Sequence, residues 1–224
     1  MTNAPKAVLW DFDGTLIDSE PIWAQGEREV MRRRGHAWDN THDVSFVGQS
    51  MEATARHMAA AVGDEALWPA LVDEVEGYVA ERLGESLPWV DGVRELLEEV
   101  AAQGVRMAVV TASSNRILEA ARPHLEDYVH TIVTADDVVN HKPHPEAYRT
   151  AMARLGVAAD DCLVVEDSVP GVASGRAAGA VVYAVPAPIV ALESQPGVHV
   201  RRGRLTGVTW ADLADAWRSL RKAL

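Results

Sequence analysis

Two aspartates one residue apart, Asp11 and Asp13, follow directly on a short apolar run near the start of the chain. The run Ala7-Val-Leu-Trp10 has the composition of a buried strand, and a strand sends successive side chains to opposite faces. Once this strand ends at Asp11, Gly14 allows a sharp turn, so both carboxylates can face one crevice. Open α/β folds bind ligands at this carboxyl edge of the sheet. The pair therefore indicates a reactive site, and an Asp-Gly surface turn is the alternative if the segment is taken alone.

Polar residues also follow two later apolar segments that are expected to be strands of the same sheet. Thr111-Ala112-Ser113 comes after the segment 105–110, and Glu166-Asp167 comes after the segment 162–165. Parallel strands share a carboxyl edge, so these side chains should converge with the aspartate pair. Taken alone, either group is equally well explained as a helix N-cap. Their joint occurrence at successive strand ends favours one shared site.

Lys142 supplies the single ammonium group expected at this site. The only other lysines among the 21 basic residues are Lys6 and Lys222. A lysine beside hydroxyl groups is suited to holding a phosphate. Four carboxylates close together would raise one another's pKa values unless a cation neutralised them, and an oxygen-rich site suits Mg²⁺. The set therefore predicts a site for a phosphate group and a magnesium ion.

The remaining pattern predicts an α/β fold, a Rossmann-like doubly wound parallel sheet with a small all-helical cap inserted after the first strand. Strands are expected at about 6–11, 105–110, 131–134, 162–165 and 181–185. The region from about 22 to 86 has the pattern of helices without strands. The predicted core is therefore 1–18 and 88–224, with the cap at 19–87. The stretch 186–203, rich in Pro and Gly, is expected to be an exposed loop.

Composition limits the class of protein. The 224 residues, 48% hydrophobic and 24% charged, are typical of a globular chain that can bury a full core. A formal net charge of −12 argues against nucleic acid or an anionic membrane as a partner. The single cysteine, Cys162, allows no internal disulfide, and no apolar stretch suits a signal peptide or a membrane span. We expect a soluble, cytoplasmic protein, and the oligomeric state stays open.

The motifs, in this order, resemble those of the haloacid dehalogenase superfamily. The matching segments are Asp11-Phe-Asp-Gly-Thr, Thr111, Lys142 and Glu166-Asp167, and the resemblance covers nearly the whole chain. Longer segments around the same residues are similar to the branch that contains sugar phosphatases and β-phosphoglucomutases. The resemblance implies a Mg²⁺-dependent phosphatase that hydrolyses a small phosphorylated metabolite, such as a sugar or polyol phosphate, through an aspartyl phosphate.

The resemblance also implies a role for each acidic residue. Asp11 would be the nucleophile that takes up the phosphoryl group. Asp13 would be the general acid for the leaving group and then the base that activates water. Mg²⁺ would be held by the Asp11 carboxylate, the Asp13 carbonyl and Asp167, with Glu166 adjacent or acting through water.

The other matched residues are implied to bind phosphate. Thr111, the Ala112 N–H and Lys142 would hold the equatorial phosphoryl oxygens, where charge spreads in the transition state. Ser113 is a further, weaker candidate for the same task. The resemblance also implies a cis peptide bond between Lys142 and Pro143, since X-Pro bonds are the usual place for one.

A β-phosphoglucomutase-like mutase is the main alternative. Trp23 stands where those mutases have a histidine, and the loop Gly48–Glu52 lacks their basic residue. Only arginines such as Arg28 and Arg56 are available there to hold a second phosphate. We expect instead that Trp23 and Gln49 contact a neutral sugar, which favours a phosphatase.

Two other classes explain fewer residues. A dehalogenase shares the nucleophile but needs neither a metal nor a second acid, which leaves Asp13 and Asp167 unexplained. A phospho-acceptor signalling domain has its acid pair near the start of the chain and its acceptor in the middle. Here a pair lies at 166–167, and the cap would have no purpose. The sequence therefore favours a phosphatase over both.

Overall fold

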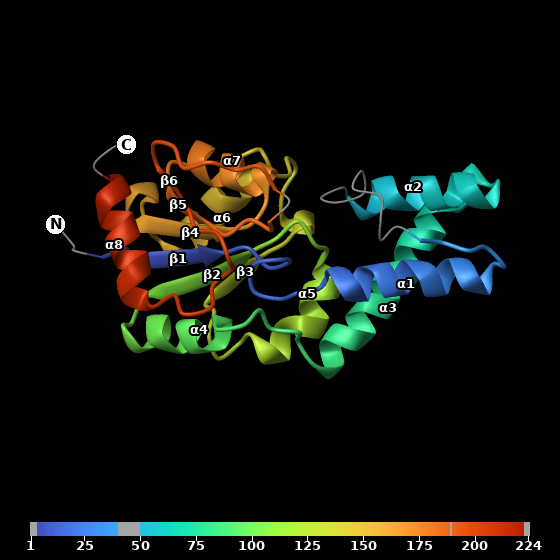
Figure 1. Cartoon of the computed structure of the whole chain (residues 1–224), viewed down its shortest axis with the longest axis horizontal. Coiled ribbons are helices and arrows are strands. Elements are labelled where there is room, and N and C mark those ends of the chain that lie inside the picture. Colours follow the sequence, from blue (N-terminus) through green and yellow to red (C-terminus); the bar gives the residue numbers. More distant parts are fainter. Residues whose placement is uncertain (1–3, 40–49, 189, 222–224) are drawn as a thin grey trace. The chain divides into compact units, whose positions relative to one another are not determined.

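The computed structural model describes residues 4–39, 50–188 and 190–221. The chain folds as two compact units (Figure 1). One comprises Met1–Asp18, Pro88–Asn115 and His124–Leu224, and the other comprises Ser19–Leu87 and Arg116–Pro123. The second unit thus includes a short segment from the later half of the chain, in addition to the helical insertion. The function of that insertion as a cap stays a prediction.

The first unit is built on a six-stranded parallel sheet with the strand order β3-β2-β1-β4-β5-β6. The strands are β1 (Ala7–Trp10), β2 (Arg106–Val110), β3 (Thr131–Val133), β4 (Cys162–Glu166), β5 (Val181–Ala184) and β6 (Val198–Val200). All residues of β1 are buried, as expected for a central strand that is covered on both faces. The predicted Rossmann-like parallel sheet is confirmed.

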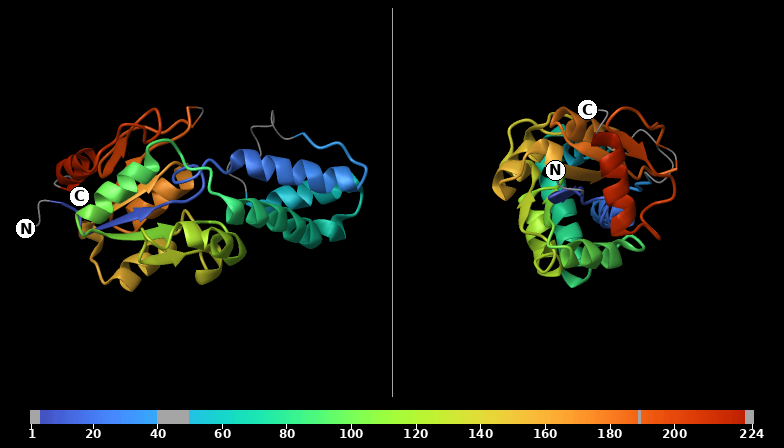
Figure 2. Two further views of the ribbon diagram at one scale, coloured as in Figure 1. Left: turned by 90° about the horizontal axis from the view of Figure 1, so that it is seen from below. Right: turned by 90° about the vertical axis from the view of Figure 1, so that its left-hand side faces the viewer.

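Helices cover both faces of this sheet (Figure 2). α6 (Glu146–Leu155) packs on β1, β2 and β3, and α7 (Val169–Ala177) packs on β4 and β5. α8 (Trp210–Arg221) packs on β5 and β6 and contacts α4 (Val93–Ala102). Ala7 and Leu9 of β1 belong to the core beneath α6 and α7. Because strand side chains alternate between faces, the continuous apolar strands supply two cores.

The stretch 186–203 is not simply the exposed loop that the sequence predicts, because it contains β6. Val198 is fully buried and pairs with Val182 of β5. The Val182 N–H donates to the Gly197 carbonyl oxygen at 2.9 Å. This strand is too short for its alternation to stand out among flanking turn residues. It therefore becomes recognisable only through its pairing with β5.

The second unit is helical. Its elements are α1 (Glu20–Arg33), α2 (Met51–Val62), the 3₁₀ turn η1 (Glu65–Leu67), α3 (Trp68–Glu85) and most of α5 (Asn115–Ala121). α3 buries Leu71, Val75, Val79 and Leu83, one stripe at helical spacing. Further 3₁₀ turns in the chain are η2 (Arg122–His124), η3 (Ala135–Asp137) and η4 (Ala159–Asp161). Among the described helices, none is long and apolar enough to cross a membrane.

Candidate active site

The register of the sheet brings the predicted site residues to one edge. Trp10 at the end of β1 pairs with Val109 of β2 and with Val165 of β4. The Asp11 N–H donates to the Val165 carbonyl oxygen at 2.9 Å, which extends this pairing by one residue. Asp11 and Glu166 therefore follow equivalent strand positions, and their side chains meet although they are far apart in sequence.

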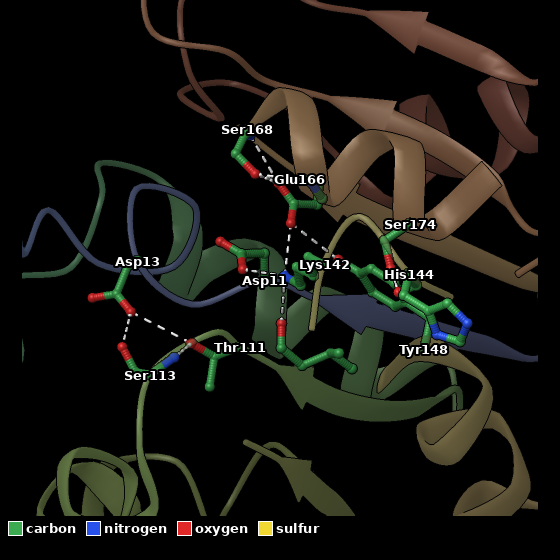
Figure 3. A network of polar contacts seen from close by, with 12 residues as sticks. Asp11, Asp13, Thr111, Ser113, Lys142, His144, Tyr148, Glu166, Ser168 and Ser174 are labelled. Carbon is green, nitrogen blue, oxygen red and sulfur yellow. Dashed lines mark hydrogen bonds and ion pairs between the residues drawn. The ribbon is translucent and has the colours of Figure 1, made fainter. Parts of the chain in front are cut away.

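Lys142 lies at the centre of this edge (Figure 3). Its Nζ donates to Asp11 Oδ1 at 2.6 Å, to Glu166 Oε1 at 2.7 Å and to the Val110 carbonyl oxygen at 3.0 Å. The three charged side chains are 7% (Lys142), 9% (Asp11) and 0% (Glu166) exposed. An ammonium group has three N–H donors, so these contacts use all of them. The peptide bond between Lys142 and Pro143 is cis, as predicted.

Three carboxylates form one acidic cluster at this position. Asp11, Glu166 and Asp167 each offer an oxygen atom, and these atoms lie within 4.8 Å of one another. Gly14 makes room for the cluster, because its φ is +83° and a Cβ there would lie 2.2 Å from Asp167 Oδ2. A residue with a side chain would be strained at this φ and would also displace Asp167. Such a group of carboxylate oxygens can hold a metal ion.

The charges in this cluster are not balanced. Burial, followed by the charge of Glu166, raises the pKa of Asp11 to about 7. Burial and the charges of Asp11 and Glu166 raise the pKa of Asp167 to about 9. Burial acts to lower the pKa of Lys142, but the charges of Asp11 and Glu166 hold it well above its usual value. One ammonium therefore does not neutralise three carboxylates, and a bound cation would lower the carboxyl pKa values.

Asp13 faces a different group of side chains (Figure 3). Its Oδ2 accepts from Ser113 Oγ at 2.7 Å and from Thr111 Oγ1 at 3.4 Å. Thr111 Oγ1 in turn accepts from the Ser113 N–H at 3.0 Å. The sequence groups four carboxylates in one site. The structure divides them into the cluster of three and Asp13, which two hydroxyl groups orient.

The remaining predicted residues, Ala112, Trp23 and Gln49, lie in three different parts of the chain. Ala112 is exposed between the two hydroxyl residues that contact Asp13. Trp23 lies half-buried on α1 in the helical unit. Gln49 lies outside the described residues. The functional roles expected for these three residues stay predictions.

Sequence reasoning missed two residues that shape the site. Tyr148, fully buried on α6, donates its hydroxyl to Glu166 Oε1 at 3.2 Å. Gly171 on α7 leaves room for the same carboxylate, since a Cβ there would lie 1.5 Å from Glu166 Oε1. The signal for Tyr148 is its place in the first turn of the helix that follows Lys142. The signal for Gly171 is a glycine inside a predicted helix, which usually has a packing reason.

Several known proteins resemble this chain in sequence. A family model described as haloacid dehalogenase-like hydrolase matches residues 8–185. Validoxylamine A 7'-phosphate phosphatase of Streptomyces hygroscopicus subsp. limoneus is 34% identical over 177 residues, which cover 78% of this chain and 82% of that protein. Hexitol phosphatase B of Escherichia coli O157:H7 is 30% identical over 223 residues, which cover 92% and 96%.

A solved structure shares the fold. The HAD hydrolase of family IA, variant 3, from Entamoeba histolytica HM-1:IMSS superposes with a TM-score of 0.79 at 24% identity. The superposition covers 96% of this chain and 99% of that chain. At this level of identity the likeness establishes the fold and nothing about the substrate.

Proposed function

Because the chain belongs to the haloacid dehalogenase-like hydrolase family, we propose that it is a Mg²⁺-dependent phosphomonoesterase for a small phosphorylated metabolite. The reaction proceeds through an aspartyl phosphate on Asp11. The observation that carries this proposal is the arrangement around Asp11. Lys142 contacts its carboxylate at 2.6 Å, and a separate acid, Asp13, is hydrogen-bonded by hydroxyl groups. A nucleophile, a phosphate-binding cation and a proton donor are the groups that this chemistry requires.

In the first step, a carboxylate oxygen of Asp11 attacks phosphorus, and the bond between phosphorus and the substrate oxygen breaks. Asp13 gives its proton to that leaving oxygen, which departs as an alcohol. Lys142, Thr111 and the Ala112 N–H stabilise the charge that spreads over the phosphoryl oxygens, with Ser113 as a further donor. The products of this step are the free alcohol and phosphorylated Asp11.

In the second step, water attacks the phosphorus of phosphorylated Asp11. Asp13, now ionised, takes the proton from the water, and the bond between phosphorus and the Asp11 oxygen breaks. Inorganic phosphate leaves, and Asp11 and Asp13 return to their starting states. Hydrogen bonds from Ser113 Oγ and Thr111 Oγ1 support this role, because they hold the Asp13 carboxylate in a fixed orientation.

The residues at the sheet edge fit a magnesium ion. The three clustered side chains offer carboxylate oxygen atoms, and burial, followed by the charges of neighbouring carboxylates, raises the pKa values of Asp11 and Asp167. We propose Asp11, the Asp13 carbonyl and Asp167 as ligands, with Glu166 adjacent or acting through water. When bound, magnesium supplies positive charge that stabilises the negative charge on the transferring phosphoryl group.

We further propose that residues 19–87 act as a cap that sets specificity, with Trp23 and Gln49 as candidate substrate contacts. The names of the relatives, a validoxylamine A 7'-phosphate phosphatase and a hexitol phosphatase, support a sugar or polyol phosphate as substrate. The single cysteine supports a cytoplasmic location. The net charge of −12 supports small metabolites rather than nucleic acid or membranes as partners.

Phosphate release from a panel of sugar, polyol and nucleoside monophosphates tests the proposal. We expect release with Mg²⁺, none after chelation with EDTA, and a preference for sugar or polyol phosphates. Release that is unaffected by EDTA would contradict the metal dependence, and no release from any substrate would contradict the phosphatase.

A coupled assay with β-glucose 1-phosphate tests the mutase alternative. A phosphatase should release inorganic phosphate without any bisphosphate primer. Formation of glucose 6-phosphate that depends on a catalytic bisphosphate, with little free phosphate, would show that the protein is a mutase.

A further inference from the structure

We propose that Tyr148 is a positioning residue that holds the Glu166–Lys142 ion pair in place against Asp11. The role of the pair in catalysis rests on the proposed function, but the structural part of the inference does not. Tyr148 lies on α6, in the same core as β1 and β4, and its side chain is fully buried. Its hydroxyl is placed on Glu166 and its ring on Lys142 (Figure 3).

Glu166 is held at both of its oxygen atoms. Oε1 accepts from Lys142 Nζ at 2.7 Å and from the Tyr148 hydroxyl at 3.2 Å. Oε2 accepts from the Ser168 N–H at 2.8 Å and from Ser168 Oγ at 2.9 Å. A carboxylate offers about four acceptor sites, so these bonds saturate it. Glu166 is thus oriented as a partner of Lys142, and Tyr148 supplies one of the four bonds.

Lys142 is shared between two carboxylates at nearly equal distances, 2.6 Å to Asp11 and 2.7 Å to Glu166. The ammonium also lies 5.1 Å from the centre of the Tyr148 ring, within the range of a cation–π contact. The Tyr148 hydroxyl and the Lys142 ammonium share Glu166 Oε1, each taking one of its two acceptor sites. Without the hydroxyl, that oxygen would be left with the ammonium as its only partner, and Lys142 would be drawn toward Glu166 and away from Asp11.

The substitution Tyr148→Phe separates this role from packing, because it removes the hydroxyl and keeps the ring. The matched control is Tyr183→Phe on β5, outside the site. This buried tyrosine lies against His199, with the two ring centroids 4.9 Å apart. Urea unfolding of both variants reports any general loss of stability. If Tyr148 is a positioning residue, Tyr148→Phe should alter the surroundings of the Lys142 ammonium, and Tyr183→Phe should not.

The Lys142 ammonium can be observed directly, because Lys6 and Lys222 are the only other lysines in the chain. In protein with ¹⁵N-labelled lysine, the buried Lys142 ammonium should give a resonance that exchanges slowly with water. We expect Tyr148→Phe to shift this resonance and to speed its exchange at least about tenfold, the effect of losing one hydrogen bond to a charged group, with no change in Tyr183→Phe. An unchanged Lys142 resonance in Tyr148→Phe would overturn the inference. This measurement needs no substrate, so it is independent of the proposed function.

Kinetics test the consequence for catalysis. We expect Tyr148→Phe to lower kcat about tenfold with little change in KM, since the contact it disturbs acts on the transferring group. In a Lys142→Arg background, the same change should cost less than about twofold, because coupled residues are not additive. A full additional loss in that background would mean that Tyr148 acts independently of Lys142, and the inference would be wrong. If the wild-type protein releases no phosphate, only the proposed function fails.

Discussion

The sheet edge and the helical unit both hold charged side chains in pairs, but the pairs differ in burial. At the sheet edge, Lys142 bonds two carboxylates, and no side chain of the three is more than 9% exposed. On α1 of the helical unit, Arg32 and Arg33 share Glu29, with exposures of 72%, 59% and 27%. The contact distances are similar, between 2.6 Å and 3.0 Å in both regions.

The difference shows that burial, rather than contact distance, decides how much stability is lost when one partner of an ion pair is removed. Water screens the pairs on α1, so either partner can be lost at little cost. At the sheet edge, removing one partner leaves an uncompensated charge in the interior. Charged side chains are kept in a protein interior only where they make many hydrogen bonds. Perturbed pKa values of buried groups are typical of functional sites.

Asp11→Asn should lower kcat by about 10⁴-fold or more, because an amide cannot take up the phosphoryl group. The fold should persist, since Lys142 keeps Glu166 as a partner. The measurement is phosphate release with Mg²⁺ present, together with urea unfolding. Asp73→Asn, which removes an aspartate that pairs with Arg116 on the helical unit, is the matched control and should be fully active. Substantial activity in Asp11→Asn would exclude Asp11 as the nucleophile.

Asp13→Asn should lower kcat/KM for an alkyl phosphate by about 10²- to 10⁴-fold, the usual contribution of general acid–base catalysis. An aryl phosphate has a better leaving group and needs little protonation, so its loss should be clearly smaller. Comparing the two substrates with one enzyme preparation isolates the acid role from any structural change. Equal losses on both substrates would argue against Asp13 as the acid.

Lys142→Met should lower the free energy of unfolding by about 3–5 kcal/mol, because the buried carboxylates lose their cation. Arg33→Met on α1 removes a cation from the exposed pair and should leave the unfolding midpoint nearly unchanged. Urea unfolding of both variants in one buffer measures the contrast. If the two substitutions destabilised the protein equally, burial would not be the property that separates the two regions. Lys142→Arg should also reduce activity, because a planar guanidinium replaces a compact ammonium poorly.

Without metal, the stability of the protein should depend on pH through the acidic cluster. The pKa of Asp167 is about 9 in the folded protein against an ordinary value of 3.8, so the folded state holds the proton more tightly. This contribution is present at low pH and is lost as the pH rises from about 4 toward about 9. The urea midpoint in EDTA should therefore fall over that range, and Asp167→Asn should reduce the fall.

Magnesium should oppose this loss, because a cation that binds the ionised carboxylates of the folded state stabilises that state. The stabilisation by Mg²⁺ should grow with pH in the wild-type protein and shrink in Asp167→Asn. Asp73→Asn, which changes an aspartate of the helical unit that pairs with Arg116, should follow the wild-type curve. If the stability of Asp167→Asn had the same pH dependence as that of the wild-type protein, groups other than Asp167 would be responsible for that dependence.

Trp23→Ala should have the smallest effect, an increase in KM of a few fold for the preferred sugar phosphate. The substitution removes apolar contact from the helical unit and leaves the charged groups of the sheet edge intact. A small aryl phosphate is the control, and its KM should change less. An equal change in KM for both substrates would show that Trp23 does not contribute to substrate specificity.

Much of the site could be predicted from sequence because its residues stand at strand ends. Asp11, Asp13, Thr111 and Glu166 each follow an apolar strand, and parallel strands share one carboxyl edge. Lys142 was recognisable as the one lysine within the body of the chain. The buried stripe of α3 was likewise visible at helical spacing. These features depend on residues that are close together in the chain, so they can be recognised from a single sequence.

Tertiary structure alone decided the rest, because each remaining feature depends on residues distant in the chain. β6 is a strand only by its pairing with β5, and three residues carry too little pattern to reveal it. The division of the four carboxylates follows from where hydroxyl groups and the lysine stand around them. Tyr148 contacts Glu166, 18 residues later in the chain, because α6 packs across the sheet. The sequence determined which groups reach the edge, and packing determined which of them touch.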